Sequence, residues 1–90
     1  MEIEKLLSAL KETLTYLNNS ESSVYSNRSV NEIIQDLEKI ILEINKSQRY
    51  NKAHLGFLFA PTGAIQDTSI DNGWGDKFLE ISSVVDHFVE

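Results

Sequence analysis

The side chains that could do chemistry are densest in one glycine-containing segment late in the chain. Asp67, Ser69 and Asp71 alternate there, as do the oxygen ligands at positions 1, 3 and 5 of an EF-hand calcium loop. Such a loop also needs glycine at position 6 and a bidentate acid at position 12, where this chain has Asn72 and Phe78. Without the bidentate acid a calcium site loses its strongest donor, so we expect no metal ion here.

Two histidines, His54 and His87, are the other side chains that commonly carry catalysis or bind metals. They lie 33 residues apart, and neither has a partner at a spacing typical of a metal pair. No serine stands in a Gly-x-Ser-x-Gly turn, and the absence of cysteine excludes a thiol nucleophile and thiolate metal sites. We therefore expect no catalytic residue and no cofactor, and we predict that the protein is not an enzyme.

Apolar residues repeated at the period of an α-helix predict the elements that position these side chains. The first stripe consists of Ile3, Leu6, Leu7, Leu10, Leu14 and Leu17. The second follows a Ser29–Glu32 capping box and consists of Ile33, Ile34, Leu37, Ile40, Ile41 and Ile44. The last helix begins at about Gly75, and its stripe consists of Trp74, Phe78, Ile81, Val85 and Phe88. A shorter helix is expected over 48–60.

These elements predict an all-α fold in one domain, residues 1–90. We expect a small bundle of three to four helices with an irregular loop, at about 60–75, before the last helix. That loop holds the only proline and three of the four glycines. A long connection in so small a domain is more often functional than a short one. Two alternatives stay open: two short strands between 64 and 71, or a purely structural loop held on the bundle by Ile65 and Ile70.

Seven residues in and beside this loop are candidates for contact with a partner. They are Thr62, Gln66, Asp67, Ser69, Asp71, Asn72 and Trp74. Trp74 has two interpretations. Its regular spacing to Phe78 and Ile81 favours a place in the core, whereas exposure would make it an interface anchor.

The net charge of −6 is spread unevenly. Residues 60–90 contain six acidic residues against Lys77 alone, a net charge of −5, while Lys46, Arg49 and Lys52 form one basic island. An acidic chain repels phosphates, so no nucleic-acid partner is expected. The acidic third is typical either of a surface for a basic protein or of ordinary solubility charge.

Membrane and export signals are not expected. The longest stretch that looks apolar, Leu55–Ala60, is six residues long, whereas a bilayer span needs about 20. We expect no membrane partner and no signal peptide. A chain without cysteine is then expected in the reducing cytoplasm.

One pattern suggests relatives. It consists of Leu58-Phe59-Ala60-Pro61-Thr62-Gly63, Gln66-Asp67, Ser69-Ile70, Asn72-Gly73-Trp74 and Phe78-Leu79. In these residues the chain resembles a group of small uncharacterised bacterial helical proteins, over about residues 30–90. The resemblance implies a bacterial origin and a standalone helical domain whose loop is the functional part, and it implies no activity. Small acidic bacterial proteins of this type are sometimes immunity or antitoxin partners, which is an analogy of class.

The sequence therefore favours a non-enzymatic protein-binding module, in its sharpest form an immunity- or antitoxin-like inhibitor of a basic partner. One alternative is a small enzyme or ligand-binding protein that uses the loop at 60–75. Another is a structural subunit of a homo-oligomer. The expected state is a monomer or a homodimer.

Overall fold

The apolar stripe near the N-terminus forms helix α1 in the computed structural model, which describes residues 2–22, 28–60 and 63–89. α1 spans Glu2–Asn18 and buries Leu6, Leu10 and Leu17. Thr13 also points into the core, where its hydroxyl donates to the carbonyl of Ala9 at 2.8 Å. The buried hydroxyl is thus satisfied within its own helix.

α2, Val30–Ser47, begins at the predicted capping box. The hydroxyl of Ser29 accepts from the amide of Glu32 at 3.2 Å and lies 3.3 Å from Oε1 of the same residue. The helix ends at Gln48, whose left-handed φ of 57° lets its amide donate to the carbonyl of Ile44.

α3, Lys52–Leu58, confirms the short helix expected over 48–60 and narrows its bounds. Asn51 caps it, because its Oδ1 accepts from the amide of His54 at 2.9 Å.

The prediction of an irregular loop at 60–75 is wrong for half of its length, because Ala64–Asp71 forms a further helix, α4. Ile65, Thr68 and Ser69 point inward at helical spacing, and this packing supports two turns that the local sequence does not suggest. The same finding excludes the alternative of two strands between 64 and 71.

The chain then turns at Asn72-Gly73 and enters α5, Gly75–Val89. Gly73 has a φ of +81°, which an Asn-Gly pair readily provides. The described residues thus form five helices and no strand. The all-α expectation is confirmed, and the predicted count of three to four helices is too low by the one that replaces the loop.

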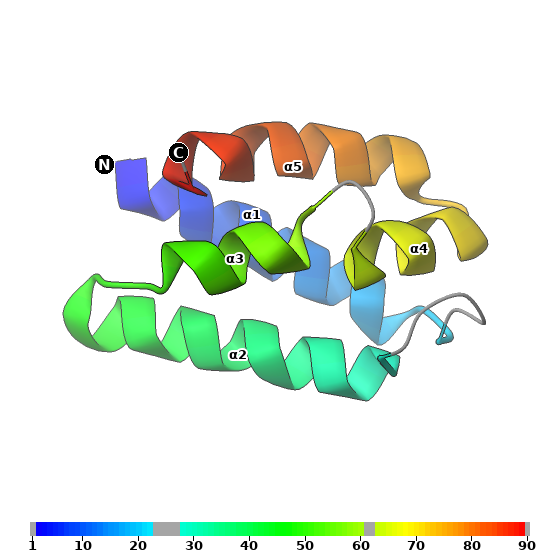
Figure 1. The fold of residues 1–90 in the computed structure, drawn as a ribbon, viewed down its shortest axis with the longest axis horizontal. Helices are drawn as coiled ribbons and strands as arrows, with labels where there is room; N and C mark the ends of the chain where they lie inside the picture. Colours follow the sequence, from blue (N-terminus) through cyan, green and yellow to red (C-terminus); the bar gives the residue numbers. More distant parts are fainter. Residues whose placement is uncertain (1, 23–27, 61–62, 90) are drawn as a thin grey trace.

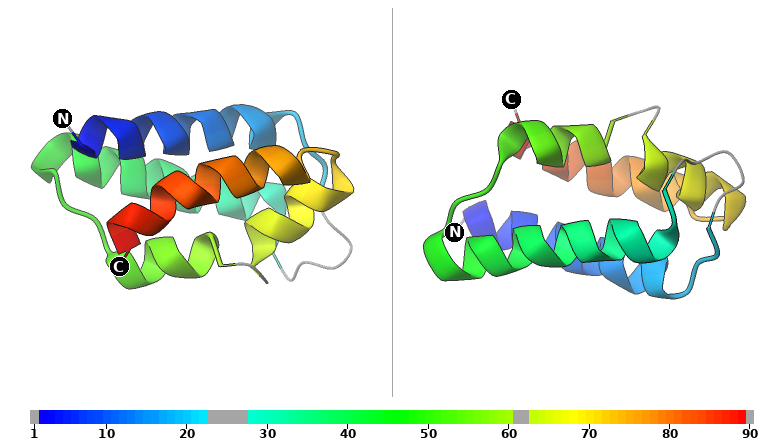
Figure 2. Two further views of the ribbon diagram at one scale, coloured as in Figure 1. Left: turned by 90° about the horizontal axis from the view of Figure 1, so that it is seen from above. Right: turned by 60° about the horizontal axis from the view of Figure 1, so that its bottom comes forward.

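Figure 1 shows α3 and α4 one after the other in front, between α2 and α5, with α1 behind them. The views in Figure 2 show that α1 runs beside α2 on one side and crosses near α5 on the other. The molecule measures 35 × 22 × 21 Å. Its core gathers the inner faces of all five helices, and the rings of Phe59 and Phe78 stack within it at 6.2 Å. None of the described helices has the length and apolar character needed to cross a membrane.

Candidate functional site

The outer sides of α4 and α5 present two largely exposed aliphatic side chains. Ile70 is 60% exposed and Leu79 is 59% exposed. A Cβ atom added at Gly75 would lie 3.4 Å from Cγ1 of Ile70, so the Ile70 side chain rests against the first turn of α5. Leu79 lies four residues after Gly75 on the same side of that helix. The side chains of Ile70 and Leu79 therefore lie on the same part of the surface, beside the first turns of α5.

Carboxylates accompany both aliphatic groups. Asp67 stands three residues before Ile70 on α4, and Asp76 stands three residues before Leu79 on α5; residues at this spacing share a helix face. Asp71, also exposed, follows Ile70. We call the surface formed by Asp67, Ile70, Asp71, Asp76 and Leu79 the α4–α5 face.

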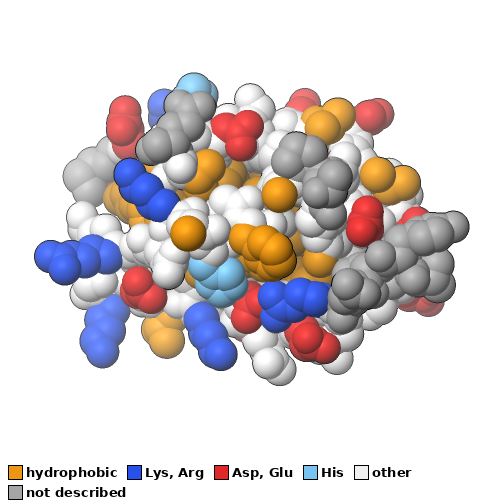
Figure 3. All heavy atoms as spheres, in the orientation of Figure 1, with side chains coloured by type: hydrophobic (Ala, Val, Ile, Leu, Met, Phe, Trp, Pro, Cys, Tyr) orange, Lys and Arg blue, Asp and Glu red, His pale blue; other side chains and the backbone are white. Residues whose placement is uncertain are grey.

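The one lysine or arginine in residues 60–90, Lys77, is directed away from this face. Its Nζ lies 3.4 Å from Glu12 on α1 and 3.4 Å from Glu80. The negative charge of Glu12 is the main cause that raises the pKa of Lys77. The hydrogen bond between Lys77 and Glu12 raises it further, and so does Glu80. In Figure 3, acidic side chains lie beside hydrophobic ones over α4 and α5, whereas Lys and Arg gather mainly over α2 and α3. The α4–α5 face is therefore an acidic surface with an aliphatic centre.

Three of the seven candidate contact residues lie on α4 with at least part of their side chains exposed: Asp71 is exposed, and Gln66 and Asp67 are half-buried. Asp67 and Asp71 are four residues apart and so share one side of the helix. Ser69 is buried and donates to the carbonyl of Gln66 at 2.7 Å, so it supports the helix rather than a surface. Thr62 lies outside the described residues. The sequence suggested for Ile70 only a role in holding the loop on the bundle, and it suggested no contact role for Leu79, which belongs to the pattern shared with the bacterial proteins.

Asn72 holds two distant segments together. Its Nδ2 donates to the carbonyls of Glu21 at 2.8 Å and Thr68 at 2.9 Å, while its Oδ1 accepts from the amide of Glu21 at 2.9 Å. These bonds use both ends of the side-chain amide. Asn72 therefore anchors the chain after α1 to the end of α4.

Trp74 belongs to the core, which confirms the interpretation favoured by its spacing. It is 7% exposed, its ring stacks on Tyr16 at 5.0 Å, and its Nε1 donates to the hydroxyl of Ser20 at 2.9 Å. Trp74 therefore fixes the start of α5 against the end of α1, and it is not an exposed anchor.

His54, on α3, lies beside an ion-pair cluster of Arg28, Glu32 and Asp36. Oδ2 of Asp36 is 2.5 Å from the guanidinium of Arg28 and 3.8 Å from Nε2 of His54. Arg28 Nε also lies 3.7 Å from Glu32. His54 therefore brings α3 beside the ion pairs at the start of α2.

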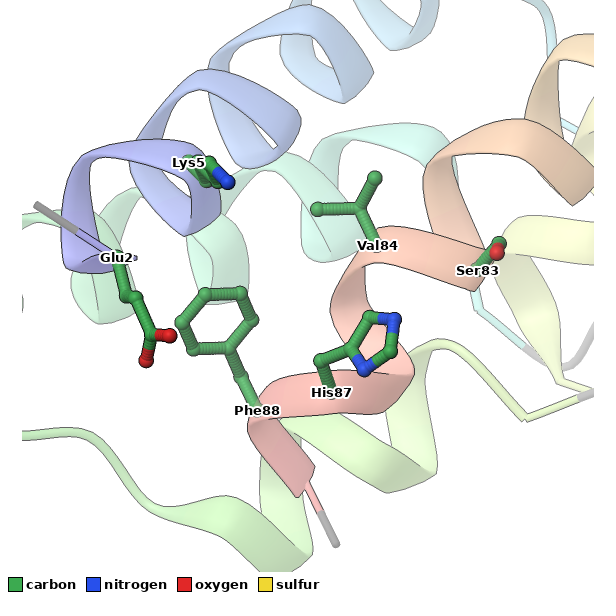
Figure 4. A pocket seen from close by; sticks show the side chains of 6 residues that line it. All are labelled: Glu2, Lys5, Ser83, Val84, His87 and Phe88. Carbon is green, nitrogen blue, oxygen red and sulfur yellow. The ribbon is translucent and has the colours of Figure 1, made fainter.

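His87 lies in a surface hollow of about 490 Å³ between the first turn of α1 and the last turns of α5 (Figure 4). Its lining residues are Glu2, Lys5, Ser83, Val84, His87 and Phe88. A second hollow, of about 410 Å³, adjoins it along the same pair of helices and shares Lys5 and Val84. Sequence reasoning missed Glu2 and Lys5, because only the fold brings them to residues near the other end of the chain.

Comparison with known proteins gives no relative: no family model, no curated protein and no solved structure matches this chain. The resemblance to small bacterial helical proteins therefore stays a prediction.

Proposed function

We propose that this protein is a non-enzymatic protein-binding module whose α4–α5 face contacts a basic surface of another protein. The observation that carries the proposal is the pair of largely exposed aliphatic side chains, Ile70 and Leu79, among carboxylates of the same two helices. Exposed aliphatic groups gain free energy when a partner covers them. The surrounding carboxylates select a partner of positive charge and speed its association.

The charge of this face also favours a different protein over a second copy. A two-fold dimer places the same patch of both copies in contact. Through the α4–α5 face it would set Asp67, Asp71 and Asp76 against their own equivalents, and such like charges repel. A basic partner would not be repelled by these carboxylates.

In its most specific form, the proposal is an immunity- or antitoxin-like inhibitor in the bacterial cytoplasm. Nucleases and related toxins bind phosphates through lysine and arginine side chains. An acidic face with an aliphatic centre can occupy the same cationic groups and exclude the nucleic acid. The acidity of residues 60–90 supports this version. The resemblance to bacterial proteins supports the bacterial origin that it assumes.

The experiment compares partner capture by matched charge variants. Tagged wild-type protein, Asp67→Lys/Asp71→Lys and Glu38→Lys/Glu43→Lys are each incubated with lysate of the source cell at low salt. The two double variants change the net charge equally, but Glu38 and Glu43 lie on the exposed side of α2. We expect one basic protein to be retained by the wild type and by the α2 variant and to be lost from the α4–α5 variant.

Circular dichroism and thermal melting of each variant establish that the fold is retained. The captured protein should also be released as salt rises, since screening weakens an electrostatic contact. Equal retention by both double variants would overturn the assignment to the α4–α5 face. Failure of the wild type to retain any basic protein would overturn the binding proposal itself.

A further inference from the structure

The hollow between α1 and α5 has the size and the mixed lining of a small-molecule site. Its volume of about 490 Å³ falls within the range of roughly 300–1,000 Å³ that such sites occupy. Val84 and Phe88 supply apolar walls, and Glu2, Lys5 and His87 supply polar groups. Ligand sites combine apolar walls with a few placed polar groups in this way.

The two charged side chains of the hollow have opposite sign and project from positions three residues apart on α1. This spacing places the Cβ atoms of Glu2 and Lys5 about 5–6 Å apart. Figure 4 shows the carboxylate of Glu2 beside the ring of Phe88 and the side chain of Lys5 on α1, apart from that carboxylate. Within the residues that the structure describes, neither charge takes part in an ion pair.

The apolar wall opposite these charges is held in place from the far side of α5. The hydroxyl of Tyr50 donates to the carbonyl of Phe88 at 2.8 Å. The next residue, Val89, packs against α3, since a Cβ atom added at Gly56 would lie 3.7 Å from its Cβ. The last turn of α5 is therefore fixed at two points, and the wall of the hollow is formed before any ligand arrives.

We propose that this hollow binds a small zwitterion with an aliphatic body, the chemistry of a free α-amino acid such as leucine. The ligand carboxylate pairs with Lys5, its ammonium pairs with Glu2, and its aliphatic part packs on Phe88 and Val84. A ligand with one charge forms only one of the two charge-assisted contacts, so it binds more weakly. This site is separate from the α4–α5 face.

The test is a titration of ¹⁵N-labelled protein followed by NMR, with three matched ligands. They are L-leucine, 4-methylpentanoate, which lacks the ammonium, and 3-methylbutylamine, which lacks the carboxylate. We expect leucine to shift the amides of residues 2–5 and 83–88 in a saturable way. Its apparent Kd should be lower than that of either singly charged analogue by about tenfold, the usual scale for one charge-assisted hydrogen bond.

Charge-neutral variants separate the two contacts. Glu2→Gln should remove the preference for leucine over 4-methylpentanoate, and Lys5→Gln should remove the preference over 3-methylbutylamine. Lys39→Gln, an exposed position on α2, serves as the control and should retain both preferences. The amide spectrum of each free variant shows whether the fold persists.

Two results would overturn this site. One is the absence of any saturable shift at residues 2–5 and 83–88 with leucine. The other is leucine binding that Glu2→Gln and Lys5→Gln leave unchanged. Either result leaves the partner-capture experiment on the α4–α5 face unaffected, so the two proposals fail separately.

Discussion

The indole of Trp74 stacks on the ring of Tyr16, with centroids 5.0 Å apart and planes inclined by 21°. This contact joins the start of α5 to the end of α1. The hydrogen bond that Trp74 Nε1 donates to the hydroxyl of Ser20 adds a second link between the same segments. Aromatic pairs of this kind contribute free energy beyond the area they bury. The start of α5 is therefore fixed to the end of α1 by a buried aromatic contact.

Removal of the aromatic contact between Trp74 and Tyr16 should destabilise the fold strongly. We expect Trp74→Ala to lower the free energy of unfolding by about 3–5 kcal/mol, the usual cost of truncating a buried aromatic residue. Urea denaturation followed by circular dichroism measures the change. Leu42→Ala is the control, because Leu42 is 67% exposed and such a change costs at most about 0.5 kcal/mol. A Trp74→Ala variant as stable as the control would contradict the assignment of Trp74 to the core.

The side chain of Asn72 should contribute less to the free energy of unfolding than that of Trp74. Asn72→Ala removes three hydrogen bonds to Glu21 and Thr68, and we expect a loss of about 1–3 kcal/mol because the partner groups are part-exposed to water. Asn72→Asp keeps the acceptor for the Glu21 amide but loses both donated bonds, so its loss should be intermediate. Hydrogen exchange at the Glu21 amide should accelerate most in the alanine variant; unchanged exchange there would contradict the anchoring role.

Tyr50 should make stability fall at alkaline pH. Burial raises the pKa of its phenol above the ordinary value of 10.0, and the neutral phenol donates to the carbonyl of Phe88. The unfolded chain releases this proton first, so the contribution is fully present below about pH 10 and is lost as pH rises through the folded pKa.

Tyr50→Phe tests this pH dependence. At pH 7 it should cost about 1 kcal/mol, the usual worth of one hydrogen bond. Its free energy of unfolding should also fall less steeply above pH 10 than that of the wild type. Identical alkaline slopes in urea denaturation would contradict a role for Tyr50.

The protein alone should be a monomer, since the like charges of the α4–α5 face disfavour a two-fold contact. Light scattering should then give a mass of 10.2 kDa at low salt. A stable mass of about twice that value would instead favour the homo-oligomer alternative. In that case Leu79→Ser and a matched change at Leu42 would show which exposed leucine lies in the interface.

The helices with continuous apolar stripes could be predicted from the sequence, and α4 could not. α1, α2 and α5 each repeat large aliphatic or aromatic residues at helical spacing, so the period is visible without tertiary information. In α4 the inward positions are Ile65, Thr68 and Ser69. Two of these three residues are small and polar, so the sequence of α4 shows no apolar stripe at helical spacing. The flanking Pro-Thr-Gly and Asn-Gly sequences suggest only turns.

The same limit applies to the surfaces. The acidic bias of residues 60–90 was visible in the sequence, but the place of Ile70 beside α5 depends on how α4 packs against Gly75. The hollow with Glu2 and His87 was also invisible, because it unites the two ends of the chain. Spacing along the sequence carries information within one helix, whereas these surfaces arise between helices.

The central claim is that a basic protein binds the aliphatic centre of the α4–α5 face, and its most direct test is the affinity of the captured partner for an Ile70→Ser/Leu79→Ser variant. Both side chains are largely exposed, so the thermal midpoint of the free variant should stay close to that of the wild type. Calorimetric titration should give an affinity at least about tenfold weaker, as loss of central apolar contacts in an interface does. An affinity equal to that of the wild type would contradict the account.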